Sequence, residues 1–208
     1  MRRVVAVVGR KGGAGKTTTA LNLSGALTER GYDVTMVDLD PQSSLTRLVN
    51  KGIVPAVLEL GPQAENRAAR GAAAAANWLA AQISNEGVYI IDTPPQLGAI
   101  LDAAVAVADR VILPTRLAQQ DLDSLLDTLD HCRQRVLIVP NAVSRYKVHQ
   151  TALQSLRAAF NGQTWAKEIP ESVTILEACN AGLPVVMYKR RGAPATAYRT
   201  LAQEVLPA

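Results

Sequence analysis

Aromatic and cysteine residues are scarce in this chain. Only 4% of its 208 residues are aromatic, and the two cysteines, Cys132 and Cys179, stand far apart without any Cys-x-x-Cys spacing. This pattern argues against a disulfide scaffold and a zinc site, and it is typical of proteins in a reducing cytosol. Since apolar residues make up 48% of the chain, we expect a core built mostly from Ala, Val, Leu and Ile.

Long apolar runs are also missing. The first run, residues 4–9, is shorter than the ~7–15 residues of a signal-peptide core. No segment approaches the ~18 apolar residues of a membrane span. We therefore expect a soluble cytoplasmic protein. The length fits one compact domain over residues 1–208, because single domains commonly contain ~100–250 residues.

The charge is unevenly distributed along the chain, although the net charge is only +4. Residues 1–130 contain 12 Lys or Arg and 14 Asp or Glu, whereas residues 131–208 contain 10 and 4. A basic C-terminal part indicates a polyanionic partner. A solvated basic surface without a partner is the alternative that charge alone leaves open.

Short apolar runs rich in β-branched residues recur and predict buried strands, because both faces of each run are apolar. The predicted strands are residues 4–8, 34–37, 88–91, 111–113 and 136–139. Helical patterns lie between and after them, at residues 16–30, 64–83, 98–108, 117–131, 149–160, 172–181 and 194–205. This alternation predicts an α/β fold with a mostly parallel central sheet and helices on both faces.

A glycine-rich stretch, GRKGGAGKTTT, follows the first predicted strand at residues 9–19. Between a strand and a helix, such a stretch is typical of a phosphate-binding loop, whose backbone N–H groups and helix N-terminus attract phosphate. Lys16 is placed to reach the β- and γ-phosphates, and the Thr17 hydroxyl to bind Mg²⁺. The candidate nucleotide contacts are Lys11, Gly12, Gly13, Ala14, Gly15, Lys16, Thr17 and Thr18. Arg10 stands where the usual pattern has its first glycine.

Three acidic residues follow predicted strands. Asp38 and Asp40 lie in MVDLDPQ, and Asp92 ends the strand of VYIIDTPP. Since the carboxyl ends of parallel strands meet at the ligand crevice, we expect them near the loop. Asp92 is predicted to hold Mg²⁺ through water, Asp38 to steady the metal shell, and Asp40 to orient an attacking water. The chain has no Asn-Lys-x-Asp motif for guanine, which favours ATP over GTP as the hydrolysed nucleotide.

Three motifs, RKGGAGKTT, VDLDPQ and IIDTPP, together resemble those of the ParA/MinD family of deviant Walker A ATPases, and EIPESVTILEACNAGLPVVMY is similar to its C-terminal region. The resemblance implies a P-loop NTPase fold with ATP and Mg²⁺ as cofactors. It implies that Lys11 reaches across a homodimer to the partner's nucleotide. It also links Asp40 to hydrolysis and places Asn141, Pro184 and Val185 near the adenine.

For the ParA branch, the resemblance implies an ATP-dependent dimer that binds nonspecific DNA of the nucleoid. A ParB-like adaptor would stimulate hydrolysis, and the cargo would be a plasmid, a chromosome or a protein cluster. The densest basic cluster is YKRRGAP, and the candidate DNA contacts are Arg145, Lys147, Arg157, Lys189, Arg190, Arg191 and Arg199. Glu171 stands where relatives often carry an arginine, so no DNA contact is expected there.

Other functions on the same scaffold remain open. A MinD-like membrane ATPase would end in a basic amphipathic helix, but this chain has no basic residue after Arg199. A metabolic ATP-dependent enzyme would need a substrate pocket of titratable groups, and His131 and His149 are isolated in the sequence. An iron-protein-like electron carrier is disfavoured because neither cysteine lies in a glycine-rich context.

Overall fold

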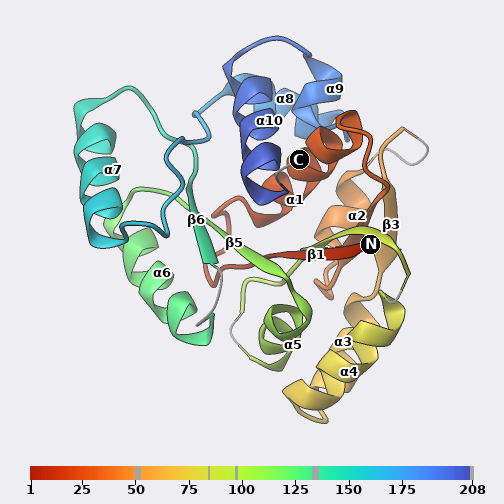
Figure 1. Cartoon of the computed structure of the whole chain (residues 1–208). Helices are drawn as coiled ribbons and strands as arrows, with labels where there is room; N and C mark the ends of the chain where they lie inside the picture. Colours follow the sequence, from red (N-terminus) through yellow and green to blue (C-terminus); the bar gives the residue numbers. More distant parts are fainter. Residues whose placement is uncertain (50–52, 84, 97, 133–135, 207–208) are drawn as a thin grey trace.

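The computed structural model describes residues 1–49, 53–83, 85–96, 98–132 and 136–206, and within them it contains one six-stranded sheet (Figure 1). The strands are β1 (Arg2–Val7), β2 (Val34–Asp38), β3 (Ala56–Glu59), β4 (Gly87–Asp92), β5 (Arg110–Thr115) and β6 (Val136–Pro140). Their order is β3-β2-β4-β1-β5-β6, and every neighbouring pair is parallel. The predicted α/β fold with a parallel sheet is confirmed.

The strand that the sequence did not predict is β3. It lies at the edge of the sheet, with Ala56 and Glu59 exposed and only Val57 and Leu58 half-buried. The other five strands are buried along most of their length and carry the continuous apolar runs. An edge strand pairs on one side only, so it is recognised from its neighbour β2 rather than from its own composition.

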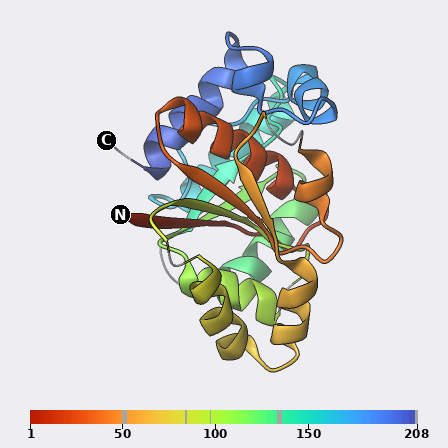
Figure 2. The ribbon, with the colours of Figure 1, turned by 90° about the vertical axis from the view of Figure 1, so that its right-hand side faces the viewer.

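Helices cover both faces of the sheet, which lies between the two helical layers in Figure 2. They are α1 (Lys16–Glu29), α2 (Ser44–Leu48), α3 (Gly61–Ala68), α4 (Ala72–Gln82), α5 (Ala99–Val107), α6 (Gln119–His131), α7 (Lys147–Ala159), α8 (Val173–Asn180), α9 (Val185–Tyr188) and α10 (Ala193–Val205).

Two apolar cores lie on opposite faces of the sheet. Val5 and Val7 of β1 pack into one core with α1, α2, α8, α9 and α10. Val4 and Ala6 point the other way and pack with α3, α4, α5, α6 and α7. This alternation explains why β1 is apolar at every position from Val4 onward, as a strand covered on both faces requires.

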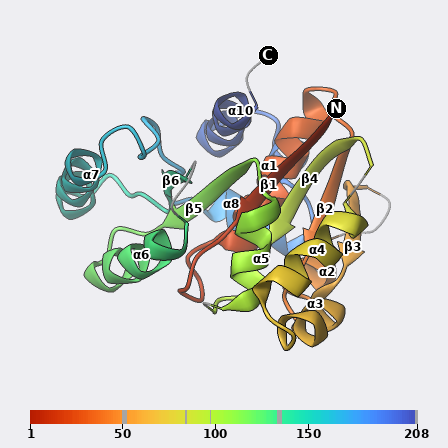
Figure 3. The ribbon, with the colours of Figure 1, turned by 60° about the horizontal axis from the view of Figure 1, so that its bottom comes forward.

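The alanine-rich segment forms two helices rather than the single helix predicted over residues 64–83. Gly71, with φ of 101°, separates α3 from α4, and the two helices lie side by side (Figure 3). That positive φ is readily adopted by glycine and strained for other residues. The break lets Ala64 and Leu79 enter the same core, which the alanine pattern did not reveal because alanine favours helix throughout.

The carboxyl ends of three central strands meet at one point. In the parallel register, Asp92 of β4 pairs with Asp38 of β2 on one side and with Val7 of β1 on the other. The glycine-rich loop begins just after β1. The sheet therefore brings the loop and the acidic motifs together, as the strand-end argument predicted.

Candidate functional site

The glycine-rich loop is held in shape by a side chain from another strand. Gly15 has φ of 100° and precedes the first turn of α1. Asn141, just after β6, donates from Nδ2 to the carbonyl of Ala14 over 2.7 Å. A Cβ at position 15 would clash with this amide. Gly15 is thus required both for its backbone conformation and for the close approach of Asn141.

Lys16 is the buried cation of the loop. Its residue is only 7% exposed, and Nζ donates to the carbonyl of Lys11 over 3.2 Å. Burial lowers the pKa of Lys16 below its ordinary value, while the charges of Asp92 and Asp40 act in the opposite direction. A desolvated ammonium that faces the loop is suited to pair with an anion, and a phosphate would restore its charged form.

Thr17 and Asp92 present the oxygen atoms that suit a hard cation. Thr17 Oγ1 donates to Asp92 Oδ2 over 2.7 Å, and Asp92 is 1% exposed. Asp92 Oδ1 is buried without a hydrogen-bond partner in the part of the chain that the structure describes. Burial raises the pKa of Asp92 to about 7, with the hydrogen bond from Thr17 acting against it. A hydroxyl beside a carboxylate with one unsatisfied oxygen fits Mg²⁺, which keeps several water ligands.

Asp38 ends β2 and pairs with Asp92 in the sheet register, and its place in the metal shell stays a prediction. Its Oδ1 accepts from the backbone N–H of Asp40 over 3.1 Å, and its Oδ2 accepts from the backbone N–H and hydroxyl of Thr46 over 2.8 and 2.9 Å. Burial raises the pKa of Asp38, whereas these hydrogen bonds lower it. Because both oxygens already have protein donors, the observed contacts of Asp38 fix the loop that carries Asp40.

Asp40 lies in that loop and is 8% exposed. Its Oδ1 accepts from the backbone N–H of Gln42 over 2.9 Å, and its Oδ2 accepts from the Ser44 hydroxyl over 2.7 Å. The carboxylate is near enough to Lys16 to influence its pKa. The two hydrogen bonds therefore fix the orientation of the Asp40 carboxylate.

The raised pKa of Asp92 predicts a pH-dependent stability. Its ordinary value is 3.8 and its folded value is about 7, so the folded state favours the protonated carboxyl and loses stability as pH rises from 4 to 7. Asp92→Asn, which cannot ionise, should stabilise the Mg²⁺- and nucleotide-free protein more at pH 8 than at pH 5, by on the order of 2 kcal/mol. Urea unfolding at both pH values measures this difference. The exposed control Asp33→Asn should show none, and a pH-independent effect of Asp92→Asn would contradict the raised pKa.

Lys11 is paired within its own chain. Its Nζ lies 2.9 Å from Oδ1 of Asp121 on α6, where the side chains are 36% and 4% exposed. Arg10 forms a second ion pair to the same helix, with Asp127. Sequence reasoning missed Asp121, although the acidic run DLDSLLDTLD begins six residues after Thr115, the last residue of the strand that neighbours β1. α6 thus holds the outer side of the loop by charge.

A cavity of about 840 Å³ opens above the loop. It is lined by every predicted loop contact from Lys11 to Thr18 except Ala14, and by Asn141. Residues that sequence reasoning missed also line it: Arg116, Leu117, Ala118, Asp121, Ala142, His149, Pro170, Glu171, Ser172, Ile175, Leu176 and Cys179. The cavity is polar at the loop and apolar toward α8, which suits a phosphorylated ligand with a flat apolar base.

Pro184 and Val185 lie outside the lining of this cavity. Pro184 packs against Gly25 in the middle of α1, where a Cβ would clash with its ring. The buried backbone N–H of Val185 donates to Asn22 Oδ1 over 2.6 Å. These residues pack against α1, and their place beside the adenine stays a prediction. Nothing in the sequence around Pro184 and Val185 indicates that they contact α1.

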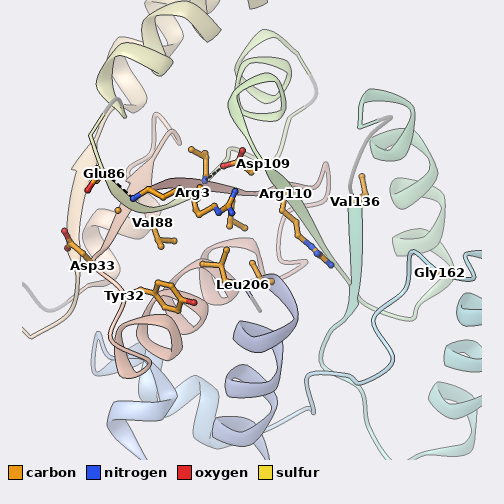
Figure 4. Close-up of a pocket in the computed structure, with 15 residues that line it drawn as sticks. Arg3, Tyr32, Asp33, Glu86, Val88, Asp109, Arg110, Val136, Gly162 and Leu206 are labelled. Carbon is orange, nitrogen blue, oxygen red and sulfur yellow. Dashed lines mark hydrogen bonds and ion pairs between the residues drawn. The ribbon is translucent and has the colours of Figure 1, made fainter. Parts of the chain in front are cut away.

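A larger cavity, about 980 Å³, lies at the opposite, amino-terminal edge of the strands (Figure 4). Its charged groups are largely satisfied within the chain. The N-terminal ammonium pairs with Glu86, Asp109 accepts from the N–H of Val4, and Arg110 pairs with Glu204. We assign the functional site to the smaller cavity, because its lining contains the loop and the buried Lys16, and because Thr17 on that lining donates to the strand-end Asp92.

The candidate DNA contacts divide into two groups. Arg199 forms two hydrogen bonds with Glu29, at 2.5 and 2.8 Å, and Arg157 pairs with Glu168 at 2.9 Å. The other five are exposed and make no ion pair within the described ranges: Arg145, Lys147, Lys189, Arg190 and Arg191. The paired arginines have structural contacts, which the distance between the partners in the sequence concealed.

No helix among the described residues has the length and apolar character needed to cross a membrane.

Comparison with known proteins gives a family and several relatives. A family model described as the CobQ/CobB/MinD/ParA nucleotide binding domain matches residues 5–185. Soj, the sporulation initiation inhibitor protein of Bacillus subtilis, is 26% identical over 253 residues, covering 99% of this chain and 98% of that protein. The maintenance of carboxysome distribution protein A of Gloeobacter kilaueensis is 31% identical over 216 residues, covering 98% and 94%.

A solved structure of similar fold contains a nucleotide. Cobyrinic acid a,c-diamide synthase from Mycobacterium smegmatis, with bound ADP and magnesium, is 25% identical with a TM-score of 0.76, covering 98% of this chain and 93% of that one. The likeness extends over the sheet and the loop that form the cavity described above.

Proposed function

Because the chain belongs to the family of CobQ/CobB/MinD/ParA nucleotide-binding domains, we propose that it is a Mg²⁺-dependent ATPase of the ParA type. The observation that carries this proposal is the group at the glycine-rich loop formed by the buried Lys16 and Asp92 and the half-buried Thr17. The similarity to Soj and to the carboxysome distribution protein supports a partition or positioning role. We propose a single ATPase domain over residues 1–208, which is supported by the two cores that share one sheet.

Each group has a defined task in this proposal. Lys16 and the loop N–H groups bind the phosphates, and Thr17 with Asp92 holds Mg²⁺, which would supply charge neutralisation between the β- and γ-phosphates. Asp40 orients the attacking water, and Asp38 fixes the loop on which Asp40 lies. Asn141 braces the loop, and the apolar wall toward α8 receives the adenine.

The proposed cellular cycle follows from ATP acting as part of a dimer interface. Two ATP-bound copies associate, with Lys11 of each offsetting the charge of the other's nucleotide. The dimer binds nucleoid DNA in the cytoplasm through its exposed basic residues, without sequence preference. A ParB-like adaptor on the cargo stimulates hydrolysis and releases the dimer. The metabolic alternative is favoured by the likeness to the diamide synthase, and it predicts turnover that neither DNA nor an adaptor affects.

Asp40→Ala is expected to keep ATP binding and lose turnover by about 100-fold or more, since it removes the group that orients water. The ATP-bound dimer should accumulate, as measured by phosphate release and by size-exclusion chromatography with ATP. Ser44→Ala is the matched control, because it removes the donor to Asp40 but keeps the carboxylate. Normal turnover by Asp40→Ala would refute this role.

The double variant Arg190→Glu, Arg191→Glu is expected to weaken binding to random-sequence DNA in the presence of ATP by at least about tenfold, with ATP binding unchanged. The slope of the logarithm of the DNA-binding constant against the logarithm of the salt concentration should become less negative by about 2, because two phosphate contacts are lost. The charge-matched control is Arg2→Glu, Arg3→Glu, at the amino end of β1. An equal loss in both double variants would exclude a local DNA-binding surface at residues 190–191.

A further inference from the structure

One cation at the mouth of the nucleotide cavity has no assigned task. Arg116 directly follows β5 and lines the same cavity as Lys11, Gly12 and Thr17. It is exposed, and it forms no ion pair or side-chain hydrogen bond with any residue that the structure describes. An arginine beside a phosphate-binding loop is well suited to pair with phosphoryl oxygens, because its planar guanidinium donates two parallel hydrogen bonds.

The backbone holds Arg116 firmly at this mouth. Thr115 before it and Leu117 after it are 3% and 6% exposed. The carbonyl of Thr115 accepts from the backbone N–H of Asn141 over 2.7 Å, and the carbonyl of Arg116 accepts from Thr115 Oγ1 over 3.1 Å. Asn141 in turn braces the loop at Ala14. The base of the arginine side chain is therefore tied to the phosphate loop, and only its outer part is free to reorient.

The other cations of the loop are already engaged. Lys11 Nζ lies 2.9 Å from Asp121, Arg10 pairs with Asp127, and Lys16 Nζ donates to the carbonyl of Lys11. Lys11 must leave Asp121 before it can meet a phosphate, whereas Arg116 has no such ion pair to break. Glu171 is the other acid on the lining of this cavity, and it lies beyond ion-pair distance of Arg116.

We propose that Arg116 is a phosphate-contact residue for the terminal phosphate of a nucleoside triphosphate, and that it discriminates the triphosphate from the diphosphate. The inference rests on the nucleotide-binding function proposed above. The phosphate belongs either to the nucleotide in the same chain or to that of a second copy across the dimer, and both sources offer the same chemistry to the guanidinium.

The first test measures nucleotide affinity. Arg116→Ala should bind ATPγS about 10- to 100-fold more weakly than the unaltered protein, with a change of less than about threefold for ADP. Arg116→Lys should recover part of the loss, because it keeps the charge but not the bidentate geometry. The matched control Arg70→Ala, exposed at the turn between α3 and α4, should change neither affinity. Since Arg116 is exposed, all variants should keep the unaltered melting temperature.

The outcomes separate this inference from the proposed function. If the unaltered protein does not bind ATPγS, the proposed function fails. If the unaltered protein binds ATPγS, and Arg116→Ala binds both ATPγS and ADP as tightly as the unaltered protein does, only the role of Arg116 is overturned. If Arg116→Ala loses the same factor of affinity for ADP and for ATPγS, its assignment to the terminal phosphate is overturned.

Mixing Arg116→Ala with Asp40→Ala, which should keep ATP binding but lose turnover, distinguishes the two sources of phosphate. In the mixed dimer, the chain with an intact Asp40 meets an intact Arg116 only from its partner. Recovery of ATP turnover in the mixture, relative to either variant alone, supports a contact with the partner's nucleotide. No recovery, together with the weakened ATPγS binding of Arg116→Ala, supports a contact within the chain.

Discussion

Lys16→Ala is expected to abolish ATP binding, with a loss of affinity of about 100-fold or more. The reason is the burial of Lys16, whose ammonium is taken from water and points at the loop where the phosphates would lie. Alanine removes this charge and leaves Asp92 and Asp40, both nearly buried, facing the incoming phosphates without a counter-ion. Repulsion then adds to the lost hydrogen bonds.

Titration of a fluorescent ATP analogue in the presence of Mg²⁺ measures the loss. Lys167→Ala is a suitable control, because Lys167 is exposed and far along the chain from the loop. Circular dichroism should confirm that Lys16→Ala remains folded. If this folded variant binds the analogue within a factor of about three of the unaltered protein, the cavity above the loop is not the nucleotide site.

Lys11→Ala is expected to lose the ATP-dependent dimer while it retains much of the nucleotide binding. In the single chain, Lys11 forms an ion pair with Asp121, and its side chain is partly exposed at the cavity mouth. Two phosphate-filled cavities that face each other would repel strongly, and a lysine from each copy offsets that charge. Removing Lys11 therefore weakens association more than it weakens binding within the chain.

Size-exclusion chromatography with ATP measures the dimer directly, when Lys11→Ala is compared with unaltered Lys11 in protein that also carries a substitution that blocks ATP turnover. Asp121→Asn provides the opposite change, because it removes the internal partner of Lys11 and should strengthen the ATP-dependent dimer. The partly exposed Lys11 would remain hydrated in that variant, which limits the cost of losing the ion pair. An unchanged dimer for Lys11→Ala would show that Lys11 does not act across an interface.

Local sequence was sufficient for the strands and for the chemistry at their ends. The run Val4–Val8 is buried on both faces, so composition alone revealed it as a central strand. Lys16 and Thr17 follow that strand at a spacing that phosphate binding requires, and Asp92 ends a strand of the same kind. Parallel strands have their carboxyl ends at the same edge of a sheet. The proximity of Lys16, Thr17 and Asp92 therefore followed from a general rule rather than from any single contact.

The contacts around that site required the tertiary structure. The strand order β3-β2-β4-β1-β5-β6 differs from the chain order, and it places α6 beside the loop so that Asp121 meets Lys11. The same arrangement brings Asn141 to Ala14, turns Pro184 toward α1, and pairs Arg199 with Glu29. Such pairs join residues more than 100 positions apart, and no periodicity or spacing encodes which surfaces pack together. Burial of the two apolar cores selects those surfaces, and the polar side chains at their margins then find their partners.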